Sequence, residues 1–204
     1  WGAGFLPAAH QGTMIKPSAP NPIADLAVPT ASYISPESEK DGRALLARFD
    51  KDYASSRPGD SRLDARIGSY ELAARLQLSA PEVLDISNET AATKSLYGLD
   101  EKVSEGFGRR CLIARRLVER GVRFVQVWSG AGGPTNNWDN HSDIVKELPA
   151  IARQVDRPAA ALLQDLHDRG LLADTLVVWS TEFGRQPFTQ GATGRDHNAG
   201  TSVG

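Results

Sequence analysis

Apolar residues at helical spacing, with charged residues between them, run through much of residues 39–120. Over residues 39–55 they recur every four positions, which predicts an amphipathic helix. A second helix is expected to begin at the N-cap residue Asp60 and to end before Pro81. The apolar positions of these two helices are Leu45, Phe49 and Tyr53, followed by Leu63, Ile67, Tyr70 and Ala74.

The rest of the N-terminal part is less regular. Residues 1–38 carry many of the prolines and predict an irregular arm, because proline lacks the backbone donor that a helix needs. Residues 79–103 are mostly polar and are expected to form a connection. A third helix is expected from Arg109 to Glu119, with Gly121 as its stop. Residues 39–120 therefore predict a helical segment.

Two segments rich in β-branched and aromatic residues, 122–128 and 175–180, predict strands. The second is almost wholly apolar, which is typical of a strand buried on both faces. Between them the spacing is helical; Pro149 is expected to kink or restart the helix, and Pro158 to open another. Residues 121–204 thus predict a βαβ unit with parallel strands. The expected fold class is α/β, with a parallel sheet flanked by helices.

The loops 129–143 and 181–200 hold most of the residues that can do chemistry. Both follow predicted strands, and functional sites in open α/β sheets form beyond the carboxyl ends of strands. Histidine nitrogen together with carboxylate oxygen suits zinc, manganese or iron better than calcium. The candidate metal ligands in these loops are Asp139, His141, Glu182, Asp196 and His197.

Two arginines, Arg185 and Arg195, stand beside these candidate ligands in the sequence. A guanidinium group matches the oxygens of phosphate or sulfate. A divalent metal next to arginine is suited to hydrolysing an anionic ester, because the metal activates a bound water or hydroxyl and offsets the negative charge of the ester. Both arginines are therefore candidate catalytic residues.

Each of these residues also has a purely structural interpretation. Asp139 would serve equally as a turn or helix cap, and His141 and His197 as surface histidines. Glu182 would pair with Arg185 in an exposed salt bridge worth less than about 1 kcal/mol. The convergence of the two loops is what favours a metal site over these alternatives.

Composition and charge narrow the class of protein. The chain has 204 residues, with 23 Lys or Arg against 25 Asp or Glu and a formal net charge of −2. Without a basic excess we do not expect it to bind nucleic acid. No apolar run approaches the roughly 18 residues that suggest a membrane span. The single cysteine, Cys111, excludes an internal disulfide and is expected to be a small core residue.

Several motifs of the sequence resemble those of the DUF1501 family. The most specific are residues 174–185, which contain Glu-Phe-Gly-Arg, and residues 194–197, Gly-Arg-Asp-His. Residues 5–7 and 10–12, the helix 111–121 and residues 138–141, Trp-Asp-Asn-His, agree with them. The resemblance covers nearly the whole chain.

The resemblance implies a sulfatase-like protein with the fold of the alkaline-phosphatase superfamily, of which this chain would hold part of the parallel sheet. Family members are larger bacterial proteins, often exported with a twin-arginine signal, so a periplasmic or other exported location is expected. The chain begins without an initiator methionine and ends directly after its richest polar cluster. We therefore expect an internal fragment of one domain, truncated at both ends.

The resemblance also implies a two-metal site holding zinc, manganese or calcium. Asp139, His141 and His197 would bind one ion, while Glu182 would stand where relatives place an Asp of the other. The residue after that Asp is often histidine in relatives, but here it is Phe183, so Asp196 or residues outside the chain would complete the second site. A Ser, Thr or Cys-derived nucleophile is expected upstream of this chain.

Three hypotheses follow for the function. The first is a metal-dependent hydrolase of sulfate or phosphate esters, acting on a small anionic ester or a sulfated glycan. The second is an exported, non-catalytic module with a degenerate metal site that binds a glycan or a protein. The third is a structural metal that pins the two loops together.

Overall fold

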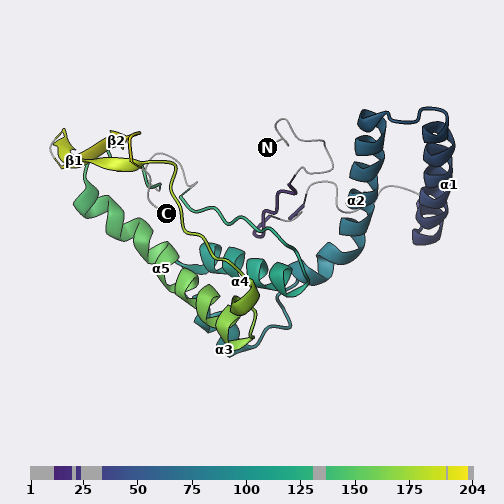
Figure 1. The fold of residues 1–204 in the computed structure, drawn as a ribbon. Helices are drawn as coiled ribbons and strands as arrows, with labels where there is room; N and C mark the ends of the chain where they lie inside the picture. Colours follow the sequence, from purple (N-terminus) through teal and green to yellow (C-terminus); the bar gives the residue numbers. More distant parts are fainter. Residues whose placement is uncertain (1–11, 20–21, 24–33, 131–136, 192, 202–204) are drawn as a thin grey trace. The chain divides into compact units, whose positions relative to one another are not determined.

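A computed structural model describes residues 12–19, 22–23, 34–130, 137–191 and 193–201 (Figure 1). The chain divides into two compact units, residues 1–85 and residues 86–204. The first unit contains the helices α1 (Pro36–Ser55) and α2 (Ser61–Leu84). The second contains α3 (Ala91–Leu96), α4 (Glu105–Glu119), α5 (Ile144–Asp168), the short 3-10 helix η2 (Leu172–Asp174), β1 (Gly184–Gln190) and β2 (Gly194–Asn198).

Both helices of the first unit begin at side-chain caps. Ser35 accepts a hydrogen bond from the backbone N–H of Ser38 at 3.1 Å, so α1 starts slightly before the predicted residues 39–55. The predicted N-cap Asp60 is confirmed, since its carboxylate accepts from two backbone N–H groups of α2 at 3.1 Å each. Such caps satisfy donors that have no partner inside the helix.

The predicted end of α2 before Pro81 is wrong, because the helix continues to Leu84. A proline removes one backbone hydrogen bond, but here it stands in the last turn, and the backbone N–H of Asp85 closes that turn on the Pro81 carbonyl at 3.0 Å. Ala80 and Val83 on either side of the proline are buried, so tertiary packing holds the turn in place.

Helices α4 and α5 pack side by side and form the core of the second unit (Figure 1). The third predicted helix is confirmed, although it begins earlier, at Glu105. Gly121 ends it with φ of +81°, and its N–H donates to the Val118 carbonyl at 2.8 Å. Cys111 is a buried core residue, as predicted, and burial raises the pKa of its thiol to about 12. The other fully buried side chains of the two helices include Leu112, Arg115, Ile151, Val155, Pro158 and Leu166.

Helix α5 runs continuously from Ile144 to Asp168 through both Pro149 and Pro158. The expected new helix at Pro158 and a restart at Pro149 are therefore wrong, while a kink at Pro149 stays a prediction. Ile151 and Val155 are buried between the two prolines, and Pro158 is itself fully buried. Burial of this apolar face outweighs the backbone hydrogen bonds that the two prolines cannot make.

Residues 79–103 are more ordered than the predicted polar connection. They contain the end of α2 and all of α3, which Thr90 caps by accepting from the N–H of Thr93 at 3.0 Å. Tyr97 is completely buried, and its carbonyl lies so close to α4 that a Cβ on Gly108 would approach it to 2.0 Å. The segment is thus part of the packed core.

The two segments predicted as strands, 122–128 and 175–180, form no β ladder within the described residues. Both carry exposed apolar side chains, with Phe124 80 % and Leu176 88 % exposed. The parallel sheet of the α/β fold therefore stays a prediction. No helix in the described part of the chain has the length and apolar character of a membrane span.

The sheet that the structure contains is a hairpin in the segment predicted to be a loop, 181–200. β1 and β2 pair antiparallel, with Arg185 opposite His197 and Gln190 opposite Gly194. Gly191 begins the turn between them with φ of +62°. Figure 1 shows this hairpin at the N-terminal end of α5.

Candidate metal centre

The hairpin β1–β2 is held against the loop that precedes α5. The backbone N–H of Arg195 donates to the Asn140 carbonyl at 3.0 Å, and the hydroxyl of Thr193 donates to the Ser142 carbonyl at 3.1 Å. Gly194 allows this contact, because a Cβ there would lie only 1.7 Å from the His141 carbonyl oxygen. Residues more than 40 positions apart in the sequence thereby meet.

Three of the predicted metal ligands converge at this contact: Asp139, His141 and His197. Asp139 Oδ1 lies 2.7 Å from His141 Nε2 and 2.8 Å from His197 Nε2, and the two nitrogens are 3.0 Å apart. Zinc in proteins lies about 2.0–2.2 Å from its nitrogen and oxygen ligands, so three donor atoms this close together could hold one ion between them.

Without a metal ion, no arrangement of protons on the two Nε2 atoms makes all three contacts favourable. If both Nε2 atoms carry protons, both donate to the carboxylate and then oppose each other. If either lacks its proton, a nitrogen lone pair faces the ionised oxygen at 2.7 or 2.8 Å. A cation that accepts a lone pair from each atom removes the conflict, so this donor set fits a metal ion.

The carboxyl group of Asp139 is ionised at neutral pH. Hydrogen bonding to His197 and then to Arg185 lowers the pKa of Asp139 to about 2. About half of the Asp139 side chain is exposed, and His197 is similarly exposed. The site therefore offers an ionised oxygen ligand that solvent and a small solute can reach.

The guanidinium group of Arg185 is hydrogen-bonded to residues of the site. Its Nη2 donates to Asp139 Oδ1 at 2.8 Å and to the Trp138 carbonyl at 3.1 Å, while its Nη1 donates to the Arg195 carbonyl at 3.2 Å. These donors have acceptors within the protein, and the contacts fix the loop relative to the hairpin. That Arg185 holds substrate oxygens stays a prediction.

Arg195 is the more available guanidinium group. Its Nη1 donates to the Gly194 carbonyl at 3.2 Å, and no carboxylate pairs with it within the described residues. Its strand position, two residues before His197, places it on the same face of β2 as His197. Of the two predicted catalytic arginines, it has the freer donors.

The two remaining predicted ligands stand apart from the triad. Asp196 Oδ1 is 3.9 Å from His141 Nδ1, on the edge of the ring away from Asp139, and it accepts from the backbone N–H of His197 at 2.8 Å. Glu182 is exposed, and within the described residues it forms no ion pair, so the alternative Glu182–Arg185 bridge is absent. The structure therefore brings together three of the five.

The side chains that accept from backbone N–H groups in this loop are those of Asn137 and Asp143, so the predicted turn or cap role falls to these neighbours of Asp139. Asn137 accepts from the backbone N–H of Asp139 at 2.8 Å, and Asp143 is the N-cap of α5, accepting from Lys146 at 3.3 Å. These two side chains shape the loop, which leaves the Asp139 carboxylate directed at the imidazoles.

Two neighbours of the triad were not predicted to take part in it. The ring of Phe183 packs on that of His197 with centroids 4.3 Å apart, so Phe183 forms a wall of the site. Gln190 Oε1 contacts His141 Nδ1. No periodicity or motif marks Gln190 in the sequence, because its place depends on the hairpin register.

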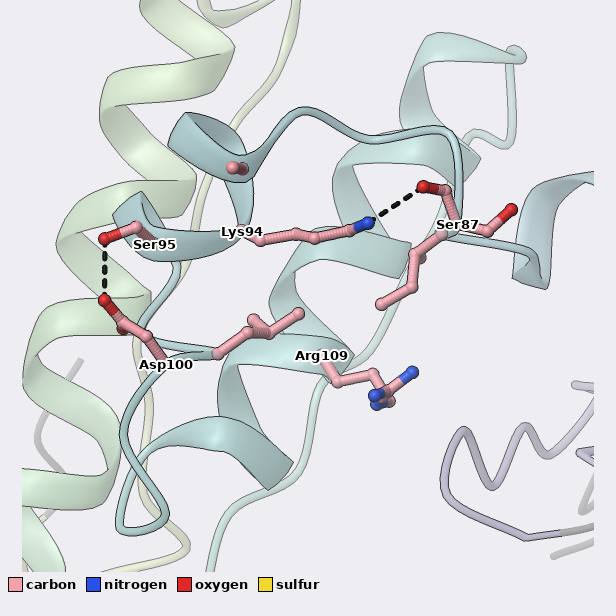
Figure 2. A pocket seen from close by; sticks show the side chains of 8 residues that line it. Ser87, Lys94, Ser95, Asp100 and Arg109 are labelled. Carbon is pink, nitrogen blue, oxygen red and sulfur yellow. Dashed lines mark hydrogen bonds between the residues drawn. The ribbon is translucent and has the colours of Figure 1, made fainter.

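A separate hollow of about 410 Å³ opens between α3 and α4 (Figure 2). Figure 2 shows Lys94 reaching to the Ser87 carbonyl and Ser95 to Asp100, with Arg109 on the facing side. Its charged groups are thus largely engaged with their neighbours: Asp100 also pairs with Arg157 at 3.3 Å, and Arg109 with Glu105 at 3.6 Å. The hollow brings no histidine and no nucleophilic pair together, so the triad remains the candidate site.

Comparison with known proteins gives one family. No curated protein and no solved structure matches the chain. A family model described as a protein of unknown function, DUF1501, matches residues 1–203. This match covers the triad, the hairpin and all of the helices. The chain therefore belongs to the DUF1501 family.

Proposed function

We propose that this chain holds the metal centre of a hydrolase that cleaves sulfate or phosphate esters. The observation that carries the proposal is the convergence of Asp139 Oδ1 with the Nε2 atoms of His141 and His197. The sulfatase-like assignment, the alkaline-phosphatase-like sheet and the exported location belong to the same proposal. They rest on the motifs of the sequence.

Each residue of the proposed site has a separate role. Asp139, His141 and His197 bind a divalent ion, for which zinc and manganese are the leading candidates given the mixed nitrogen and oxygen donors. Bound there, the ion lowers the pKa of a coordinated water or hydroxyl and offsets charge on the ester. Arg195 holds non-bridging oxygens of the sulfate or phosphate group, while Arg185 keeps the Asp139 oxygen in place.

A non-catalytic module that binds a glycan or a protein is the second candidate. Phe183 favours it, because its ring packs on His197 and supplies no ligand for a second ion. Both candidates retain a metal, so the hydrolysis of an ester is what distinguishes them.

The test is the metal content of histidine variants of the full-length protein. His141→Ala and His197→Ala each remove one of three ligands, so zinc or manganese binding should weaken at least about 100-fold, the upper end of the range for second-shell partners. His167→Ala is the matched control: His167 is an exposed histidine in the last turn of α5 that pairs with Asp168. It should bind metal like the wild type, by elemental analysis after dialysis and by titration calorimetry.

Turnover decides between the two candidates. The metal-loaded wild type should hydrolyse an aryl sulfate or aryl phosphate, and chelation or His197→Ala should abolish that activity. Full metal content in both histidine variants would overturn the metal centre. A metal-loaded protein that binds sulfated glycans without cleaving any ester would replace the hydrolase by the binding module.

A further inference from the structure

The Nδ1 edge of the His141 ring faces hydrogen-bond acceptors. Gln190 Oε1 contacts Nδ1 directly. The carboxylate of Asp196 lies on the same edge, 3.9 Å away, which is beyond hydrogen-bonding distance. With the Gln190 amide in this orientation its oxygen can only accept, so a proton on Nδ1 makes the contact a hydrogen bond.

The Nε2 edge of the same ring faces both an acceptor and a donor, the Asp139 carboxylate and the Arg185 guanidinium. Asp139 Oδ1 lies 2.7 Å from Nε2, and His197 Nε2 lies 3.0 Å away. Nη1 of Arg185 points an N–H group at Nε2 from 3.4 Å. A neutral imidazole protonated on Nδ1 has its lone pair on Nε2, the atom that belongs to the triad.

We propose that Gln190 is a positioning residue that fixes the tautomer of His141, so that the Nε2 lone pair is presented to the metal. The inference rests on the proposed metal centre. Metal-binding histidines commonly donate their other ring N–H to a protein acceptor, which sets the ring orientation and raises ligand basicity. Here that acceptor is a neutral amide on the hairpin.

The register of the hairpin places the Gln190 amide beside His141. Gln190 is the last residue of β1 and pairs with Gly194, the residue whose missing Cβ lets the hairpin approach the His141 backbone. The Gln190 amide thereby lies at one edge of the His141 ring, while His197, which pairs with Arg185 near the other end of the hairpin, lies at the opposite ring nitrogen. Gln190 and His141 are 49 positions apart in the chain.

The test compares three variants of the full-length protein. Gln190→Leu removes the acceptor at similar volume, while Gln190→Glu retains an acceptor oxygen. Gln186→Leu is the matched control: Gln186 is in the same strand, but its amide donates only to the backbone carbonyl of His197, at 3.2 Å. Nitrogen-15 NMR of the histidine rings reads the tautomer in metal-free protein at mildly alkaline pH, and zinc titration reads the affinity.

The wild type and Gln186→Leu should show His141 protonated on Nδ1. Gln190→Leu should shift His141 toward the Nε2-protonated form and bind zinc about 10 to 100-fold more weakly, whereas Gln190→Glu should restore both. A wild-type His141 protonated on Nε2, or a Gln190→Leu protein with wild-type tautomer and affinity, would overturn the inference. Failure of the wild type to bind zinc would overturn the proposed function alone, because the tautomer is measured without metal.

Discussion

The Arg185 guanidinium crosslinks the loop and the hairpin at the level of single residues. It shares Asp139 Oδ1 with both imidazoles, so the carboxylate charge is already balanced before any ion binds. Since the imidazoles bind metal in their neutral form, a bound divalent ion would leave the site with a net positive charge. A cationic, solvent-open site suits an anionic ester better than a neutral substrate.

Gly194 occupies a position at which the site cannot accommodate a side chain. In Gly194→Ala the new Cβ would lie 1.7 Å from the His141 carbonyl oxygen and 2.9 Å from the Ser142 nitrogen, both backbone atoms. The hairpin must therefore move away from the loop, and zinc affinity should fall about tenfold or more, as for other supports of metal ligands. Calorimetric titration of zinc measures the effect.

Gly200→Ala provides the control for that substitution. Its Cβ would meet only the Asn198 side chain, at 3.4 Å, so affinity should stay at the wild-type level. Unchanged zinc binding by Gly194→Ala would show that the ligands do not depend on this approach of the hairpin.

The packing of α4 against α5 includes a buried charge network at the level of whole elements. Arg115 of α4 is only 2 % exposed and pairs with Asp165 of α5 and with Glu89, both at 2.9 Å. The hydroxyl of Tyr97 donates to Asp165 at 2.9 Å, and Arg169 pairs with Asp165 at 2.6 Å. The network joins α4, α5 and the segment before α3, and so supports the helix that follows the loop 137–143.

Arg115→Met should destabilise the protein strongly. The substitution keeps much of the side-chain volume but removes the most buried cation of the network, while Glu89 keeps Arg116 and Asp165 keeps Arg169. We expect a loss near the lower end of the range of about 3–5 kcal/mol for a broken buried pair. Urea denaturation followed by circular dichroism measures it. Arg153→Met, at an exposed position of α5, should change the free energy of unfolding by no more than about 0.5 kcal/mol. Equal stabilities of the two variants would mean that the network is energetically neutral.

Over the whole molecule, local sequence patterns predicted what local interactions determine. The N-cap Asp60 and the helix stop at Gly121 were confirmed, because each depends on residues a few positions away. Pro81, Pro149 and Pro158 misled the prediction, since packing of buried neighbours outweighed the local cost of proline. The buried Arg115 network was missed because its charged residues resemble ordinary surface positions in the sequence.

Three of the five candidate ligands predicted from the sequence come together in the structure, whereas the residues that support them were not predicted. Asp139, His141 and His197 are metal-ligating residue types in two neighbouring loops, so their chemistry indicated them. Gln190 and the part played by Arg185 depend on the register of a hairpin, which a polar segment such as 181–200 does not specify.

The acid stability of the protein should depend on Glu89. Burial disfavours its ionised form, but the hydrogen bonds and charges of Arg116 and Arg115 outweigh burial and hold its pKa below the usual 4.5. A lowered pKa in the folded state stabilises the protein above the unfolded pKa, and this stabilisation is lost as the pH falls through the folded pKa. Glu89→Gln should therefore be less stable than the wild type at neutral pH, and the difference should shrink below about pH 4.5. Chemical denaturation over that range measures it, with Glu37→Gln, an exposed residue in the first turn of α1, as the control. A difference that stays constant down to the lowest pH would show that the ion pairs of Glu89 do not drive the acid response.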